Sequence, residues 1–98
     1  MSFPLVFRAA AQKEFDQAAA WYEKQKAGLG AEYVDEIQRV LSRIADQADR
    51  SPVVWQDIRE APVPRFPYAI YYRVKATRIV IIAVFHCSRD PSLWQGRA

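Results

Sequence analysis

Two side chains near the end of the chain, His86 and Arg89, are of types that could act on a phosphate ester. A histidine can exchange a proton near neutral pH, and the planar guanidinium of an arginine can hold phosphate oxygens. Both also have structural uses. A histidine at the end of a strand can hold a turn by hydrogen bonds, and Arg89 can pair with Asp90 or with a helix. The two residues define a candidate site without defining a reaction.

A second group of side chains is suited to contact rather than to proton transfer. Tyr71 and Arg73 alternate with apolar residues in the segment 66–74, so they share the strand face that those apolar residues leave free. Such a face can be exposed to solvent, or it can bind a partner. An exposed Trp94 would anchor an interface, whereas a buried one would pack the end of the chain onto the sheet. The predicted contact residues are Arg59, Arg65, Tyr71, Arg73, Arg89 and Trp94.

The distribution of charge indicates an anionic partner. The formal net charge is +3. Residues 1–50 carry seven Lys/Arg against eight Asp/Glu, whereas residues 51–98 carry seven against three. The half of the chain that holds the candidate residues therefore has a net charge of +4. A field of this sign favours nucleic acid, the ribosome or an acidic protein segment.

The sequence predicts no metal ion and no cofactor. Cys87 is the only cysteine and His86 the only histidine, and no cluster of acidic residues accompanies them, so ordinary ligand counts are not reached. Nothing around Cys87 indicates an activated thiolate. Gly28 and Gly30 join two predicted helices and do not follow a strand, so they do not form a phosphate-binding loop.

The N-terminal half is predicted to form a strand and a pair of helices. Residues 3–7 are apolar and contain Pro4, which suits an edge strand. Apolar positions recur with helical spacing over 9–26 and again over 29–48, and the glycines between them suit a tight connection. We expect an antiparallel helical hairpin whose buried residues are Phe15, Tyr22, Ile37, Leu41 and Ile44.

The C-terminal half is predicted to form the sheet. Strand patterns cover residues 53–60, 66–74 and 78–86, and the last is apolar on both faces, as in a central strand. Asp90 followed by Pro91 is typical of the start of a helix. The expected fold class is α+β, with an N-terminal strand and an α-helical hairpin packed on a mostly antiparallel sheet of three to four strands.

Length and composition predict a single domain over residues 1–98. The chain is 51% hydrophobic and 26% charged, which is ordinary for a globular protein. No apolar run approaches the roughly 20 residues that cross a bilayer, and the first residues lack the pattern of a signal peptide. We therefore expect a cytoplasmic location and no membrane partner.

Three stretches together resemble the RelE/ParE superfamily of bacterial toxins. They are GLGAEYVDEI at 28–37, RFPYAIYYRV at 65–74 and VFHCSRDPSLWQGR at 84–97. The resemblance runs over nearly the whole chain. It implies a RelE/ParE-like fold and the toxin of a type II toxin-antitoxin system, neutralised in a hetero-oligomer by a cognate antitoxin whose flexible tail wraps the toxin.

The superfamily has two modes of action. Its RelE-like members cut messenger RNA in the ribosome with basic residues on the sheet and a tyrosine near the C-terminus, and its ParE-like members poison DNA gyrase without a known hydrolytic role. Ala69, Cys87 and the pair Leu93 and Trp94 stand here where the ribonuclease branch has those residues.

The resemblance therefore favours the ParE-like branch. It implies inhibition of growth by binding to DNA gyrase through the contact residues, without catalysis. One alternative is a ribosome-dependent messenger RNA endoribonuclease, with the ribosome and messenger RNA as partners and His86 and Arg89 as catalytic residues. The second alternative is a protein-interaction module without toxicity.

Overall fold

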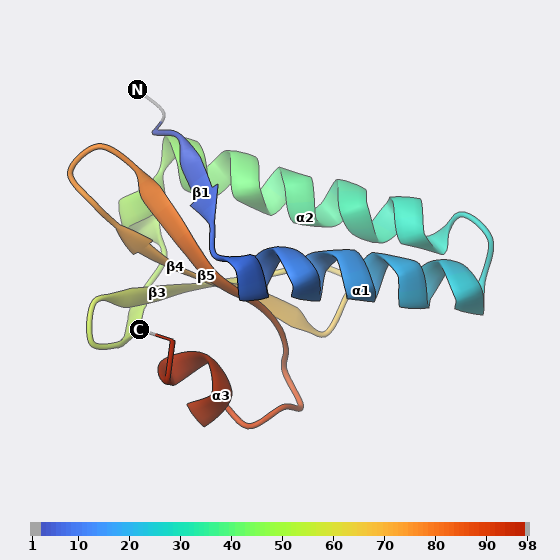
Figure 1. Cartoon of the computed structure of the whole chain (residues 1–98). Helices are drawn as coiled ribbons and strands as arrows, with labels where there is room; N and C mark the ends of the chain where they lie inside the picture. The colour runs from blue at the N-terminus through green and yellow to red at the C-terminus, as the bar shows by residue number, and fades with distance from the viewer. Residues whose placement is uncertain (1–2, 98) are drawn as a thin grey trace.

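A five-stranded sheet carries two long helices on one face in the computed structural model, which describes residues 3–97 (Figure 1). The elements are β1 (Leu5–Phe7), α1 (Ala9–Gln25), α2 (Leu29–Asp46), the 3₁₀ helix η1 (Ala48–Arg50), β2 (Val53–Trp55), β3 (Ile58–Pro62), β4 (Tyr68–Val74), β5 (Ile79–His86) and α3 (Ser92–Gln95). The strand order is β1-β5-β4-β3-β2. Only β1 and β5 among these neighbours run parallel, so the α+β prediction with a mostly antiparallel sheet is confirmed.

The sheet has more strands than the three to four predicted, because residues 53–60 form two strands and not one. Val53 pairs with Arg59 and Trp55 with Ile58, so the chain reverses at Gln56 and Asp57. Gln56 has a φ of 51°, in the left-handed region that glycine or asparagine usually occupies in tight turns. The turn could not be predicted because the pair Gln56 and Asp57 contains no glycine and is not the Asn-Gly or Asp-Gly pair that is typical of two-residue hairpin turns.

The link between α1 and α2 confirms the predicted helical hairpin. Gly28 has a φ of 88°, a conformation that glycine adopts without steric cost. The Glu23 carboxylate of α1 accepts hydrogen bonds from the backbone N–H groups of Gly28 and Gly30 at the start of α2. A Cβ at Gly30 would lie 2.7 Å from the Ala19 carbonyl oxygen, so only glycine allows the two helices to approach this closely.

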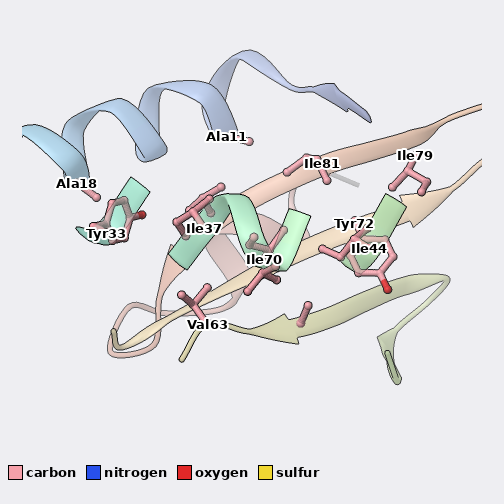
Figure 2. Close-up of a cluster of buried hydrophobic side chains, with 13 residues drawn as sticks. Ala11, Ala18, Tyr33, Ile37, Ile44, Val63, Ile70, Tyr72, Ile79 and Ile81 are labelled. Atoms are coloured by element: carbon pink, nitrogen blue, oxygen red, sulfur yellow. The ribbon is translucent and has the colours of Figure 1, made fainter. Parts of the chain in front are cut away.

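The main core lies between the helical hairpin and the sheet (Figure 2). Ile37 and Ile44 are buried as predicted, whereas Phe15, Tyr22 and Leu41 are only partly buried against the cluster. The aromatic part of the core surrounds Tyr33, which is 0% exposed and contacts the rings of Phe15, Tyr22, Phe66 and Tyr68.

A bulge in β5 builds a second apolar cluster on the other face of the sheet. Tyr71 pairs with Ala83 and Tyr72 with Ile81, so Ile82 is the extra residue. As a result Ile82 and Ala83 both belong to the cluster on the face opposite the helices, which also contains Ile58, Val80, Phe85 and Trp94. This face is therefore packed over part of its area and not merely solvated. Within residues 3–97, no helix is long and apolar enough to span a membrane.

Candidate functional site

The short helix α3 folds back onto the face of the sheet opposite the helical hairpin. The Trp94 indole stacks on the Tyr71 ring with centroids 4.1 Å apart and planes inclined by 18°, and Trp55 meets it edge-on at 6.0 Å. Trp94 is 2% exposed. Trp94 therefore packs α3 onto the sheet. A partner cannot contact its indole while α3 lies in this position.

Tyr71 is held by its hydroxyl group as well as by its ring. The hydroxyl donates a hydrogen bond to Glu60 Oε2 at 2.6 Å on the neighbouring strand. Burial raises the pKa of Tyr71, and the hydrogen bond to Glu60 raises it further. The phenol therefore stays protonated near neutral pH, and its proton is already committed to a carboxylate.

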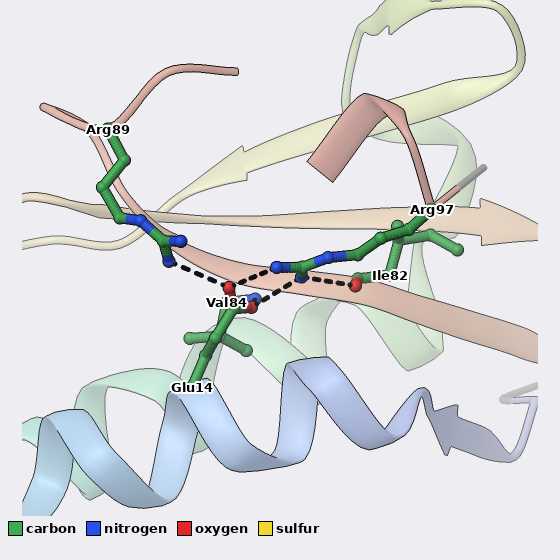
Figure 3. A network of polar contacts seen from close by, with 5 residues as sticks. All are labelled: Glu14, Ile82, Val84, Arg89 and Arg97. Carbon is green, nitrogen blue, oxygen red and sulfur yellow. Dashed lines mark hydrogen bonds and ion pairs between the residues drawn. The ribbon is translucent and has the colours of Figure 1, made fainter. Parts of the chain in front are cut away.

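Glu14 of α1 is the centre of an ion-pair network that reaches the end of the chain (Figure 3). Its Oε1 accepts from Arg97 Nη1 at 2.9 Å and its Oε2 from Arg97 Nη2 at 2.8 Å, which is a bidentate pair. Oε2 also accepts from Arg89 Nη1 at 3.1 Å. The side chain of Glu14 is 11% exposed, so this network is shielded from most solvent.

The same network covers an unpaired edge of the sheet. β1 ends at Phe7, and the last backbone hydrogen bond beside it runs from the Arg8 N–H to the Ile81 carbonyl. Beyond that point Glu14 Oε1 accepts from the Val84 N–H at 3.1 Å, and Arg97 Nη1 donates to the Ile82 carbonyl at 3.3 Å (Figure 3). Two side chains thus take the place of a neighbouring strand, which satisfies backbone groups that would otherwise invite another chain.

Arg89 joins this network to an open hollow between α1 and the end of β5. Its Cζ lies 4.4 Å from the centroid of the Phe85 ring, a cation–π contact, and its side chain is 44% exposed. The hollow has a volume of about 180 Å³, and its wall on α1 includes Trp21, which is 57% exposed. Arg89 is therefore both fixed and accessible.

His86 lines the same hollow but is occupied by the turn that follows it. Its Nδ1 accepts from the Ser88 N–H at 3.1 Å and lies 2.8 Å from the Ser88 hydroxyl. An Nδ1 that accepts places the proton of a neutral ring on Nε2. The Tyr68 ring packs edge-on against the imidazole at 5.1 Å. These contacts are those of a histidine that holds the terminal turn.

The other three arginines of the predicted set lie apart from this hollow, and each has a partner. Arg59 Nη1 donates to the Asp49 and Ser51 carbonyls at 3.1 and 2.7 Å, which ties β3 to the segment before β2. Arg73 Nε donates to both oxygens of Asp57 at 2.9 Å.

Arg65 lies on the loop before β4, with a φ of 71° in the left-handed region. It pairs with Glu32 on α2 at 2.6 Å, and the hydrogen bond to Glu32 raises the pKa of Arg65. The structure thus brings Tyr71 to Trp94 and Arg89 to His86, but it does not gather the arginines into one site.

The acidic residues around the terminal turn have structural partners. Asp90 Oδ1 accepts from the N–H of Ser92, the first residue of α3, and this hydrogen bond lowers the pKa of Asp90. α3 begins one residue later than the pattern of Asp90 and Pro91 indicated.

Cys87 is exposed and free. Over residues 3–97, no group of three or more His, Cys, Asp or Glu side chains could hold a metal ion.

Comparisons with known proteins agree with this architecture. Residues 5–91 match the sequence model of the family described as ParE toxin of type II toxin-antitoxin system, parDE. A solved structure described as the chromosomal ParDE TA system from P. aeruginosa superposes with a TM-score of 0.73 at 19% identity, covering 87% of this chain and 96% of that one. At this identity the likeness concerns the fold. No curated protein sequence matches the chain.

Proposed function

Because the chain belongs to the ParE toxin family of type II toxin-antitoxin systems, we propose that it inhibits growth by binding and poisoning DNA gyrase. A cognate antitoxin neutralises it in a toxin-antitoxin hetero-oligomer in the cytoplasm. The chain acts by contact and has no hydrolytic role. The fold and the family agree with this proposal. The arrangement of the polar side chains supports a mode of action without catalysis.

The observation that carries the proposal is the engagement of the candidate catalytic groups within the protein. Cleavage of RNA through its own 2′-hydroxyl needs a free base, a free acid and cations aimed at the phosphate. His86 Nδ1 accepts from Ser88, the Tyr71 hydroxyl donates to Glu60, and Arg89 pairs with Glu14. Within residues 3–97, the only side chain that forms a hydrogen bond with His86 is that of Ser88, and no carboxylate, lysine or tyrosine hydroxyl forms one with it.

Arg65 and Arg89 are the exposed arginines of the predicted contact set, whereas Arg59 and Arg73 are partly buried. Their side chains are 56% and 44% exposed. Arginines of this kind, held in place by a carboxylate, bind a partner with little loss of conformational freedom. We assign direct contact with gyrase to these two residues, whereas Trp94 and Tyr71 support the surface by packing.

The test measures gyrase and ribosomal activities side by side. The purified chain is added to gyrase, relaxed plasmid and ATP, and both supercoiling and trapped cleaved DNA are recorded. Arg65→Ala and Arg89→Ala should each weaken inhibition about tenfold or more, as the loss of an interface arginine does. Arg43→Ala is the matched control, because Arg43 is exposed on α2 and forms no ion pair within residues 3–97.

Two outcomes would contradict the proposal. The first is normal supercoiling in the presence of excess wild-type chain. The second is cleavage of ribosome-bound messenger RNA by the wild-type chain, reduced by about 10² in His86→Ala, since a positioned acid-base group contributes a factor of that order. A protein with a thermal midpoint like that of the wild type is required for each variant, because Arg89 also contributes to the Glu14 network.

A further inference from the structure

We propose that a cationic groove at the β1 end of the sheet binds the phosphate backbone of duplex DNA. The groove has a volume of about 240 Å³ and lies on the face of the sheet opposite the helical hairpin. Four basic side chains line it over a floor that includes two valines. These residues are Arg8, Arg73, Lys75, Arg78, Val6 and Val80. None of Arg8, Lys75 and Arg78 belongs to the predicted contact set.

The alternation of three neighbouring strands explains why the cations gather here. Arg73 and Lys75 are two residues apart on and just beyond β4, and Arg78 is two residues before Val80 on β5. Val6 pairs with Val80, and Arg8 follows two residues later. Residues two apart in a strand share a face, so the four side chains emerge on one face of three adjacent strands. Phe7 pairs with Ile81, so Arg8 lies about four residues along the strand from Arg78, and the four cations are spread over roughly 13 Å along the strands and roughly 10 Å across them.

Most of this positive charge is not neutralised by the protein. Within residues 3–97, Arg8, Lys75 and Arg78 form no ion pair and no side-chain hydrogen bond. Arg73 is paired with Asp57, but only through Nε, so its two Nη groups have no acceptor there. Free guanidinium forks of this kind match the paired oxygens of a phosphate.

The start of α1 adds to the field at the groove. α1 begins at Ala9, directly after Arg8, and it has no side-chain cap and no acidic residue in its first turn. The N-terminus of a helix carries a partial positive charge and unpaired N–H groups, and both favour an anion. The groove therefore combines three cations without an ion pair, and Arg73 paired with Asp57, with one helix end of the same sign.

A nucleic acid fits this groove better than an acidic peptide does. A peptide would gain most of its affinity by adding a strand to a sheet edge or by filling an apolar groove. The neighbouring edge is β1, which is three residues long and follows Pro4, and the apolar lining of the groove consists of only Val6, Phe7 and Val80. Phosphates need neither, because charge supplies most of their attraction to a protein.

The groove lies at the end of the sheet farthest from the hollow at Arg89. Figure 1 shows the turn between β4 and β5 beside β1, at the opposite end of the helices from the α1–α2 link, with α3 on the lower side. The choice of duplex DNA among nucleic acids rests on the proposed function, since gyrase acts on duplex DNA. A chain bound to gyrase at Arg89 would then hold the DNA of the same complex with a separate surface.

The experiment measures binding to a fluorescent random-sequence DNA duplex by anisotropy, without gyrase, over a series of NaCl concentrations. The wild type should bind with an affinity that falls with salt with a slope of about −3 on a log–log plot, because each neutralised phosphate contributes about 0.9. Lys75→Gln/Arg78→Gln should weaken binding at least tenfold at low salt and reduce the slope by about 2.

The matched control is Arg43→Gln/Arg50→Gln, which removes the same charge from exposed positions on α2 and η1. It should change the affinity less than about threefold. Equal losses in the two double variants, or no binding by the wild type at 50 mM NaCl, would overturn the proposal. So would tighter binding to single-stranded RNA, or to a polyglutamate peptide, than to duplex DNA.

These results are separable from those for the proposed function. A wild-type chain that poisons gyrase but does not bind duplex DNA contradicts the groove alone. A chain that binds duplex DNA through Lys75 and Arg78 but leaves gyrase unaffected contradicts the gyrase proposal and supports the groove.

Discussion

Glu14 and Arg97 form a bidentate ion pair although 83 residues separate them in the chain. The pair fastens the segment after α3 to the middle of α1 and places Arg97 against the Ile82 carbonyl. One carboxylate thus connects the first helix, the central strand and the end of the described chain.

Glu14→Gln should destabilise the protein by about 2 to 3 kcal/mol. Removing one partner of a buried ion pair costs about 3 to 5 kcal/mol, and the side chains of Glu14 and Arg97 are 11% and 22% exposed, which lowers the expected loss. Urea unfolding measures it. Asp16→Asn, on the exposed side of the same helix, should stay within about 0.5 kcal/mol of the wild type. Equal effects of the two substitutions would show that the network contributes nothing specific.

Trp94→Ala should cost about 3 to 5 kcal/mol, because it removes a large buried side chain from the second apolar cluster. Leu93, its neighbour on α3, is 51% exposed, and Leu93→Ala should cost less than about 0.5 kcal/mol. Thermal unfolding of the two variants provides the comparison. A wild-type midpoint for Trp94→Ala would mean that α3 is not docked in solution.

Two tyrosine-to-phenylalanine changes should have opposite effects. The Tyr33 hydroxyl is buried with no hydrogen-bond partner among residues 3–97, so Tyr33→Phe should leave stability unchanged or raise it by about 1 kcal/mol. The Tyr72 hydroxyl donates to the Ala48 carbonyl at 2.6 Å, so Tyr72→Phe should lower stability by about 1 to 2 kcal/mol. Chemical denaturation of both variants checks the order, and a loss in Tyr33→Phe larger than in Tyr72→Phe would contradict it.

Stability should fall steeply in alkali. Burial raises the pKa of Tyr22, Tyr33, Tyr68 and Tyr71 above their ordinary value of 10.0. The folded protein therefore favours the neutral form of these phenols. Their contribution to the free energy of unfolding is fully present below pH 10 and is lost as the pH rises through their raised pKa values.

Urea unfolding at pH 9 and pH 11, with phenolate absorbance as a second signal, tests the alkaline effect. Tyr33→Phe removes one of the shifted groups and should lose less stability than the wild type between the two values. An identical loss would exclude Tyr33 as a source of the pH dependence.

The helices and the central strand could be predicted because their apolar residues follow the period of the element that buries them. The limits of α1 and α2 differ from the prediction by one and two residues at their C-terminal ends, where periodicity carries no information. The β2–β3 turn could not be predicted in the same way. Gln56 takes its left-handed conformation because the surrounding strands pair, and no local preference for it exists in the sequence.

The surroundings of the predicted site residues could be predicted only in part. One of the expected partners of Arg89 was the helical hairpin, and Arg89 does pair with that hairpin through Glu14 on α1, but the residue could not be named from the sequence. The two residues are 75 positions apart, and only the fold brings them together. Glu14 gives no signal of its own, because an isolated glutamate on a helix is ordinarily solvated. Arg8, Lys75 and Arg78 were not predicted as a group because Arg8 follows β1 and the other two lie in the β4–β5 turn, and only the sheet brings these two segments together.

The position of β5 in the sheet has a consequence for synthesis of the protein. β5 pairs with both β1 and β4 and contributes to both apolar clusters, yet it is translated after every other strand. A nascent chain that has not released Ile79–His86 from the ribosome has no partner for β1, lacks Ile79, Ile81 and Val84 of the main core, and keeps only Ile58 of the buried residues of the second cluster. Neither apolar cluster can therefore be completed before β5 has been synthesised.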